Sequence, residues 1–291
     1  IDPDLADAEF IGLVRFSGDG IVALSHLRDS SPAMLARANL SGLIEWLRVG
    51  GLSVRAVDVA GDWAELNERR DLAHFVLGTK AQTLARLRGL VRHSQIEDQV
   101  AFTVTEWKQR PNTILEQIQA AFANPLLVVR SSALSEDGFT CANAGAYTSV
   151  LSVPRETTHE LRAAIEQVTA SYADANPHNQ VLVQPMVADV TLSGVVFTRT
   201  LAHGAPYYVI NYDDVSGSTE TITGGSSGEH KTLVIRRDRG RDLPSLPAGL
   251  EALVPALEEI ESLVDYDALD VEFAIGASGS IHILQVRPIA V

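Results

Sequence analysis

The stretch LDVEFAIGASGSIHILQVRPI, residues 269–289, decides the fold class. Two apolar runs flank a Gly-Ala-Ser-Gly segment, which is typical of an antiparallel β-hairpin. Further strand candidates precede it: LLVVR (126–130), VLVQPMV (181–187), GVVFTR (194–199), YYVINY (207–212) and TLVIRR (232–237). Helices with one apolar face are predicted after LGTK (77–80) and over 113–123, 156–175 and 248–264. This mixture predicts an α+β fold of two lobes, with antiparallel sheets and flanking helices.

Strand alternation gives the terminal hairpin one polar face. Asp270 and Glu272 point to the same side because strand side chains alternate with a period of two, and Gln285 and Arg287 share a side for the same reason. A four-residue turn at 277–280 places Glu272 opposite Gln285 and Asp270 opposite Arg287. The apolar neighbours then point the other way: Val271, Phe273, Ile275, Leu284 and Val286.

The residues alone leave two interpretations of this polar face. One is a ladder of ion pairs on the protein surface. The other is a buried magnesium site, because carboxylate and amide oxygens suit this hard cation. The apolar flanks favour burial, and buried charges need partners or a metal. An arginine beside the metal would hold an anionic group of a substrate.

A second polar stretch follows a predicted buried strand at LVVRSSALSEDGFTCANAGAY, residues 127–147. Arg130 leaves the strand end, and Ser131 and Ser132 offer N–H and hydroxyl donors. The polar loop as far as Gly145 is suited to fold over a ligand. A guanidinium followed by such a loop indicates an anion site.

A third element is LGTKAQTL, residues 77–84. Thr79 and Gln82 form a capping box, so a helix is predicted to begin at Lys80. A lysine in the first turn opposes the helix dipole, and if exposed it carries no function. With the free N–H groups of a helix start it makes an anion site. These groups would together neutralise a triphosphate: Lys80, Arg130, Arg287 and a metal at Glu272 and Gln285.

Three segments resemble the ATP-grasp nucleotide-binding domain of the phosphoenolpyruvate synthase and pyruvate phosphate dikinase family. They are VRSSALSEDGFTCANAGAYTSVLSV, VLVQPMV with SGVVFTR, and LDVEFAI with IHILQVRPI, in the family order. The resemblance extends from about Leu77 to Ile289, and LGTKAQTL is similar to the family's glycine-lysine motif, with Thr79 where glycine is usual. NYDDVSGSTETITGG (211–225) departs from the synthases and is more similar to a subgroup related to the L-glutamine kinase.

The resemblance implies ATP and Mg²⁺ as cofactors and gives roles to the matching residues. Lys80 and Arg130 would contact the phosphates of ATP, and Arg287 would sit on the phosphoryl group that is transferred. Glu272 and Gln285 would bind the magnesium ion.

Further matches concern the surroundings of the nucleotide. Asp270 would support the metal. The hinge between the lobes, around Gln184, Met186 and Val187, would meet the adenine through its backbone. Gly145 would lie at the tip of a hairpin that covers the phosphates.

Full family members relay phosphate through a histidine on a separate swivelling domain, in the motif G-G-x-[ST]-[SC]-H. The segment GGSSGEH, Gly224 to His230, has one residue too many, and the helix of small residues that should follow is absent. His230 is therefore not interpreted as the carrier. We expect the partner to be a histidine-carrier domain on another polypeptide or on a missing part, which passes phosphate to a small acceptor such as an amide or amino acid.

Two other classes of function remain open. One is a self-sufficient kinase or ligase that phosphorylates a small molecule directly and releases ADP, with Asp213 and Asp214 as an acceptor-side base or second metal ligands; a solvated turn is the simpler interpretation of that pair. The other is a nucleotide-sensing module. A sensor need not keep the catalytic residues, so their presence argues against it.

Composition excludes other classes. The net charge is −14, from 37 acidic and 23 basic residues, and nucleic-acid binding needs phosphate neutralisation by Lys and Arg. No apolar run reaches the roughly 20 residues that span a bilayer, and the acidic N-terminus is not a signal peptide. The single cysteine, Cys141, excludes an internal disulfide and fits a reducing cytoplasm. The basic run RRDRGR (236–241) is interpreted as a solvated loop.

Three parts are expected along the chain. Residues 1–70 form an N-terminal segment without recognisable chemistry, in which FIGLVRFSGDGIVALSH (10–26) predicts a hairpin and 32–49 a helix ended by Gly50 and Gly51. Residues 71–182 are expected to form the N-terminal lobe of the ATP-grasp domain, and residues 183–291 its C-terminal lobe.

Overall fold

The computed structural model divides the chain into two compact units, residues 1–65 and 66–291. It describes residues 12–57, 66–67, 69–133, 148–172, 176–215, 230–237, 246–247 and 249–289. Within these ranges no helix is long and apolar enough to span a membrane.

The first unit is helical where the sequence predicts a hairpin. Helix α1 (Gly18–Ser30) begins after Ser17, whose side chain accepts a hydrogen bond from the Gly20 N–H. This N-cap satisfies one of the free N–H groups of the first turn, so a helix forms where the glycines suggested a β-turn. The hairpin prediction for residues 10–26 is therefore wrong over its described second half.

The helix predicted over 32–49 is interrupted. It consists of α2 (Pro32–Leu35) and α3 (Leu40–Val49). Asn39 starts the second helix because its side chain accepts a hydrogen bond from the Gly42 N–H. Gly50 caps α3, as predicted.

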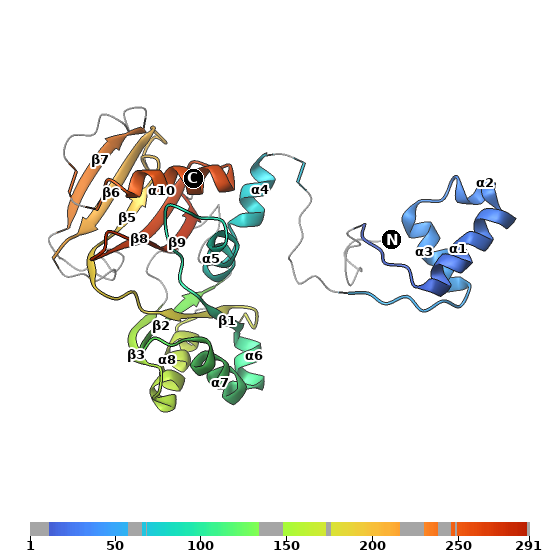
Figure 1. The fold of residues 1–291 in the computed structure, drawn as a ribbon, viewed down its shortest axis with the longest axis horizontal. Coiled ribbons are helices and arrows are strands. Elements are labelled where there is room, and N and C mark those ends of the chain that lie inside the picture. Colours follow the sequence, from blue (N-terminus) through green and yellow to red (C-terminus); the bar gives the residue numbers. More distant parts are fainter. Residues whose placement is uncertain are drawn as a thin grey trace. The chain divides into compact units, whose positions relative to one another are not determined.

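In the second unit, the first sheet has the strand order β1-β4-β2-β3, with antiparallel neighbours. Its strands are Val100–Thr103, Gln180–Pro185, Leu126–Ser132 and Ser149–Pro154, respectively. Helices α6 (Val104–Gln109), α7 (Pro111–Ala121) and α8 (Thr158–Ala170) gather beside it (Figure 1). Leu127, Val129, Val181 and Val183 pack into one core with these helices. By alternation, Arg130 and Gln184 lie on the opposite face of the sheet.

The second sheet has the order β7-β6-β5-β8-β9 and is also antiparallel. Its strands are Lys231–Arg236, Tyr207–Asp213, Val190–Phe197, Leu269–Gly276 and Ile281–Pro288, respectively. Helices α4 (Arg69–Val76), α5 (Lys80–Arg88) and α10 (Leu253–Val264) contribute apolar side chains to its core. Figure 1 shows α10 lying along this sheet. The α+β prediction of two antiparallel sheets with flanking helices is confirmed.

The register of the β8–β9 hairpin confirms the predicted pairs. Glu272 lies opposite Gln285, and Asp270 lies opposite Arg287. Nearer the turn the register shifts, because Phe273 pairs with Ile283 rather than with Leu284.

Leu284 is the extra residue of a β-bulge in this hairpin. The bulge reverses the sides of the residues between it and the turn. Ile281, Ile283 and Val286 therefore belong to the core, and Leu284 does not. The prediction that Leu284 points into the apolar face with Val286 is wrong for this reason.

Two segments join the sheets. Residues 186–189 connect β4 of the first sheet to β5 of the second. Gln95 pairs with His282 at the edge of β9, and the same segment then continues into β1 of the first sheet. The polypeptide thus crosses between the sheets at two places, beside the end of β4 and beside the turn of the β8–β9 hairpin.

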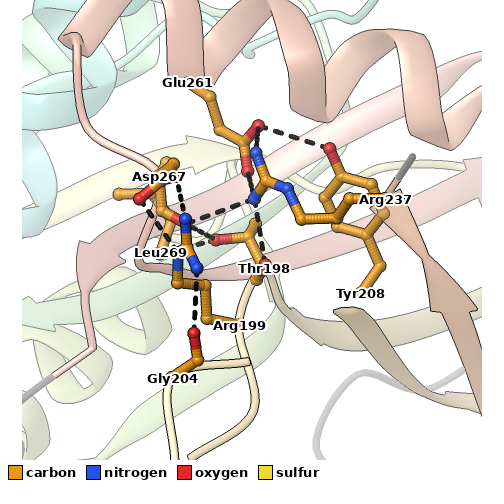
Figure 2. A network of polar contacts seen from close by, with 8 residues as sticks. All are labelled: Thr198, Arg199, Gly204, Tyr208, Arg237, Glu261, Asp267 and Leu269. Atoms are coloured by element: carbon orange, nitrogen blue, oxygen red, sulfur yellow. Dashed lines mark hydrogen bonds and ion pairs between the residues drawn. The ribbon is translucent and has the colours of Figure 1, made fainter. Parts of the chain in front are cut away.

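A buried polar network ties α10 to the strands (Figure 2). Arg237 donates to both carboxylate oxygens of Glu261, at 2.6 and 2.7 Å, and its guanidinium lies 4.9 Å from the centre of the Tyr208 ring. The Tyr208 hydroxyl donates to the same carboxylate. Only 7% of the Glu261 side chain is exposed. The interpretation of RRDRGR as a solvated loop is therefore wrong for Arg237.

The network also fixes the start of β8. Thr198 Oγ1 donates to the carbonyl of Asp267 and accepts from the Leu269 N–H, at 2.8 and 2.7 Å. Arg237 donates to the Thr198 carbonyl at 3.0 Å. Leu269 is the first residue of the strand that carries Asp270 and Glu272, so these bonds help hold both carboxylates in register.

Candidate active site

The polar face of the β8–β9 hairpin meets a side chain from the first sheet. Arg130, on β2, donates to Glu272 Oε2 at 2.7 Å. Its other terminal nitrogen donates to the carbonyl of Leu284, the residue of the bulge. Arg130 therefore joins the two sheets, and the bulge supplies the carbonyl that receives it.

The predicted hairpin residues are buried together. Asp270, Glu272, Gln285 and Arg287 are each at most 9% exposed. Arg287 donates to Asp270 Oδ2 from Nε and from Nη2, at 2.9 and 2.6 Å. This burial excludes the surface ion-pair ladder.

Asp270 is in an unusual electrostatic setting. Burial raises the pKa of its carboxyl to about 6, although Arg287 lowers it; the charge of Glu272 adds to the rise. Its second oxygen, Oδ1, is buried and has no hydrogen-bond partner among the described residues. A buried carboxylate oxygen without a partner is costly, so binding of a cation or a hydrogen-bond donor at Oδ1 would be favourable.

The start of α5 lies next to the end of β2. Thr79 and Gln82 make the predicted capping box, and the helix begins at Lys80. The Ala81 N–H donates to Ser132 Oγ at 3.0 Å, so the helix start and the serine pair after Arg130 are in direct contact. Lys80 is buried, which removes the interpretation of it as an exposed, functionless lysine.

The residues predicted to form the hinge lie at the end of β4 and in the connection from β4 to β5. Gln184 is buried near the end of β4, and Met186 and Val187 lie in the connection to the second sheet. The Met186 N–H donates to the Leu126 carbonyl at 3.0 Å. The backbone of this connection is thus hydrogen-bonded to the start of β2.

Several predicted residues lie elsewhere or outside the described part. Gly145 and Cys141 belong to residues 134–147, outside the described ranges. Asp213 is the last residue of β6 and is buried, and its Oδ1 accepts from the Val215 N–H. Asp214 pairs with Lys231 at 2.7 Å. The interpretation of this pair as a solvated turn is therefore wrong for Asp213. His230 lies immediately before β7.

The structure adds His282 to the polar face. Its Nδ1 lies 2.8 Å from Glu97 Oε1, and its Nε2 lies 2.9 Å from Ser280 Oγ. Strict alternation from Gln285 puts His282 on the apolar face, and only the bulge at Leu284 moves it to the polar one. No signal in the sequence of the hairpin identifies a bulge, so this residue was missed.

The sequence model of one protein family, described as pyruvate phosphate dikinase, AMP/ATP-binding domain, matches residues 76–242. The chain belongs to this family. The match covers more than half of the chain and includes β2, β4, β5, β6 and the start of α5. It confirms the resemblance recognised in the sequence. Among curated proteins, none matches the chain.

Solved structures similar to this member of the family include ligases with low sequence identity. The VanG D-Ala:D-Ser ligase from Enterococcus faecalis is 17% identical, with a TM-score of 0.42 over 75% of this chain and 54% of the ligase. D-alanyl-alanine synthetase A from Vibrio cholerae is 13% identical, with a TM-score of 0.45 over 75% and 57%. The matched part therefore spans little more than half of either ligase.

The residues of the hairpin fit a magnesium ion. Magnesium is usually held by one or two carboxylates together with substrate phosphates and water, and it rarely needs a cage made of protein alone. Within the described ranges, no three His, Cys, Asp or Glu side chains are grouped to hold a metal. Glu272 with the amide oxygen of Gln285 supplies the smaller set, and the unpartnered Asp270 Oδ1 lies on the same face.

Proposed function

We propose that this chain is the ATP- and Mg²⁺-dependent phosphotransferase domain of a dikinase-like system. It would move the β,γ-pyrophosphoryl group of ATP to a histidine on another domain or polypeptide, which leaves AMP. Hydrolysis of the terminal phosphate to inorganic phosphate would then leave one phosphoryl group on the histidine. From there the group would reach a small acceptor such as an amide or an amino acid. A cytoplasmic location is part of this proposal.

One observation carries the proposal. Arg130, from one sheet, meets Glu272 on the hairpin of the other sheet, whose polar face also presents Gln285 and Arg287. These are the residues that the family resemblance links to phosphate, metal and the transferred group. The start of α5, with Lys80, is in direct contact with the serine pair after Arg130.

The chain's own groups would act by position and charge. Lys80 and Arg130 would hold the phosphates, and the free N–H groups at the start of α5 favour negative charge there. Arg287 would lie against the group that is transferred and stabilise the charge on its oxygens. Glu272 and Gln285 would hold the metal, with Asp270 in support. When bound, the metal would supply positive charge that neutralises the phosphate oxygens.

Other parts of the chain would position the nucleotide. The backbone at Gln184, Met186 and Val187 would meet the adenine at the connection between the sheets. Gly145 would belong to the segment that covers the phosphates. Closure of the two sheets over ATP would exclude water and limit hydrolysis when the acceptor is absent.

Nucleotide products separated by chromatography test the relay. With ATP and Mg²⁺ alone, we expect only slow hydrolysis. Addition of a histidine-domain partner should switch on the release of AMP, whereas small amines, amides or alcohols should not. Rapid formation of ADP with a small acceptor alone would contradict the relay and favour direct transfer by a self-sufficient kinase or ligase.

A further inference from the structure

Each candidate phosphate-binding arginine on these two sheets has a carboxylate partner that is itself a candidate metal ligand. Arg130 pairs with Glu272 at 2.7 Å, and each side chain is 11% exposed. Arg287 pairs with Asp270 at 2.6 Å, and each side chain is 8% exposed. The two pairs differ in one respect. The first joins the two sheets, whereas the second lies within one hairpin.

Arg130 and Glu272 are largely buried and neutralise each other, so a ligand that binds one of them changes the charge balance of the other. A triphosphate that binds Arg130 while Glu272 stays in place brings negative charge against a carboxylate. A divalent cation that binds Glu272 while Arg130 stays in place meets a guanidinium. Either ligand alone therefore leaves a buried charge poorly compensated, which is costly. When both bind, each side chain exchanges one opposite charge for another.

The bulge makes this exchange feasible. Arg130 also donates to the carbonyl of Leu284, and this bond does not involve Glu272. The guanidinium therefore keeps one anchor between the sheets when the carboxylate turns to another partner.

We infer that Arg130 and Glu272 form a partner-exchange pair, which makes the binding of the triphosphate and of the divalent cation mutually dependent. This inference rests on the proposed function and adds to it a coupling between the two ligands: neither ligand binds tightly without the other. Coupling between two ligands is reciprocal, and its usual size is about 5- to 150-fold in affinity.

Calorimetry with inorganic triphosphate in the presence of EDTA tests the first half. Glu272→Gln keeps the shape of the side chain and removes its charge, so Arg130 loses its ionic competitor. We expect metal-free triphosphate to bind Glu272→Gln at least about fivefold more tightly than wild type. An affinity equal to or below that of wild type would overturn the inference.

Two controls separate partner exchange from a general loss of repulsion. Asp98→Asn removes one negative charge from a surface pair with Arg88 and should change the affinity less than twofold. The gain in triphosphate affinity from Glu272→Gln should disappear when Arg130 is also replaced, because it acts through Arg130. The double variant Arg130→Gln/Glu272→Gln should therefore bind metal-free triphosphate no more tightly than Arg130→Gln does. A gain that persists in the double variant would also overturn the inference.

The reciprocal half gives an independent measurement. Arg130→Gln frees Glu272, so Mg²⁺ without nucleotide should bind this variant at least about fivefold more tightly than wild type. An unchanged Mg²⁺ affinity would contradict the exchange. A different result would contradict the proposed function itself, namely that wild type binds no ATP even in the presence of Mg²⁺. If wild type binds Mg²⁺–ATP but both variants lack their gains, only the exchange is wrong.

Discussion

Arg237→Met tests the buried network of Figure 2 through its dependence on pH. The substitution removes both hydrogen bonds to Glu261 and keeps an apolar side chain beside Tyr208. Glu261 is left buried with the Tyr208 hydroxyl, 3.3 Å away. Loss of one partner of a buried ion pair costs about 3–5 kcal/mol when the other charge stays in place. We expect a loss of this size at pH 8.

The sign of the pH dependence follows from Glu261. Burial already raises the pKa of its carboxyl, although Arg237 opposes the rise. Without Arg237 the pKa rises further, so the folded variant keeps its proton in a range where the unfolded chain has lost it. Stability then falls with rising pH, and the deficit relative to wild type grows by up to about 1.4 kcal/mol per pH unit through that range.

Glu261→Gln is the matched control. It leaves Arg237, whose guanidinium stays charged at every accessible pH, without its carboxylate partner, so position 261 contributes no pH dependence to the stability of this variant between pH 5.5 and pH 8. Urea unfolding of both variants and wild type at the two pH values measures the difference. The reasoning is refuted if Arg237→Met loses as much stability at pH 5.5 as at pH 8, or if its loss at pH 8 is below about 1 kcal/mol.

Three further outcomes are expected. The pKa of the Asp270 carboxyl is raised to about 6, so wild type should lose up to about 3 kcal/mol of stability between pH 4 and 6 as this group ionises. Asp270→Asn should lack this loss, and urea unfolding across the same pH range measures it. Gly194→Ala should destabilise the chain by about 1–3 kcal/mol, because a Cβ would lie 2.5 Å from a carbonyl oxygen of β6, whereas Gly89→Ala, with open space around it, should be close to neutral in the same assay. Glu272→Ala should abolish Mg²⁺-dependent phosphoryl transfer and Gln285→Ala should weaken it, as followed by labelled phosphate; equal activity of all three proteins would contradict the metal assignment.

Local patterns sufficed for much of the fold and for the polar face. The alternation in residues 269–276 and the four-residue turn gave the pairs of Glu272 and Asp270, because both depend on neighbours in sequence. The capping box of Thr79 likewise located the start of α5.

Features that depend on contacts between residues far apart in the sequence could not be predicted from it. The bulge at Leu284 changes the side on which His282 lies, and no residue of the hairpin signals it. Arg237 looked like part of a solvated loop because its partner Glu261 is distant in sequence, on α10. The N-cap at Ser17 outweighed the turn suggested by its neighbouring glycines.

The central claim is that ATP binds where Lys80, Arg130 and the hairpin face come together. Calorimetric titration of wild type with ATP, with and without Mg²⁺, tests it directly. We expect binding in the micromolar range that needs Mg²⁺ for its tightness. Lys80→Ala and Arg130→Ala should each weaken it by roughly 10- to 150-fold, the cost of a lost hydrogen bond between charged groups, without unfolding the chain. ATP affinity unchanged in both variants, or no ATP binding by wild type with Mg²⁺, would contradict the account.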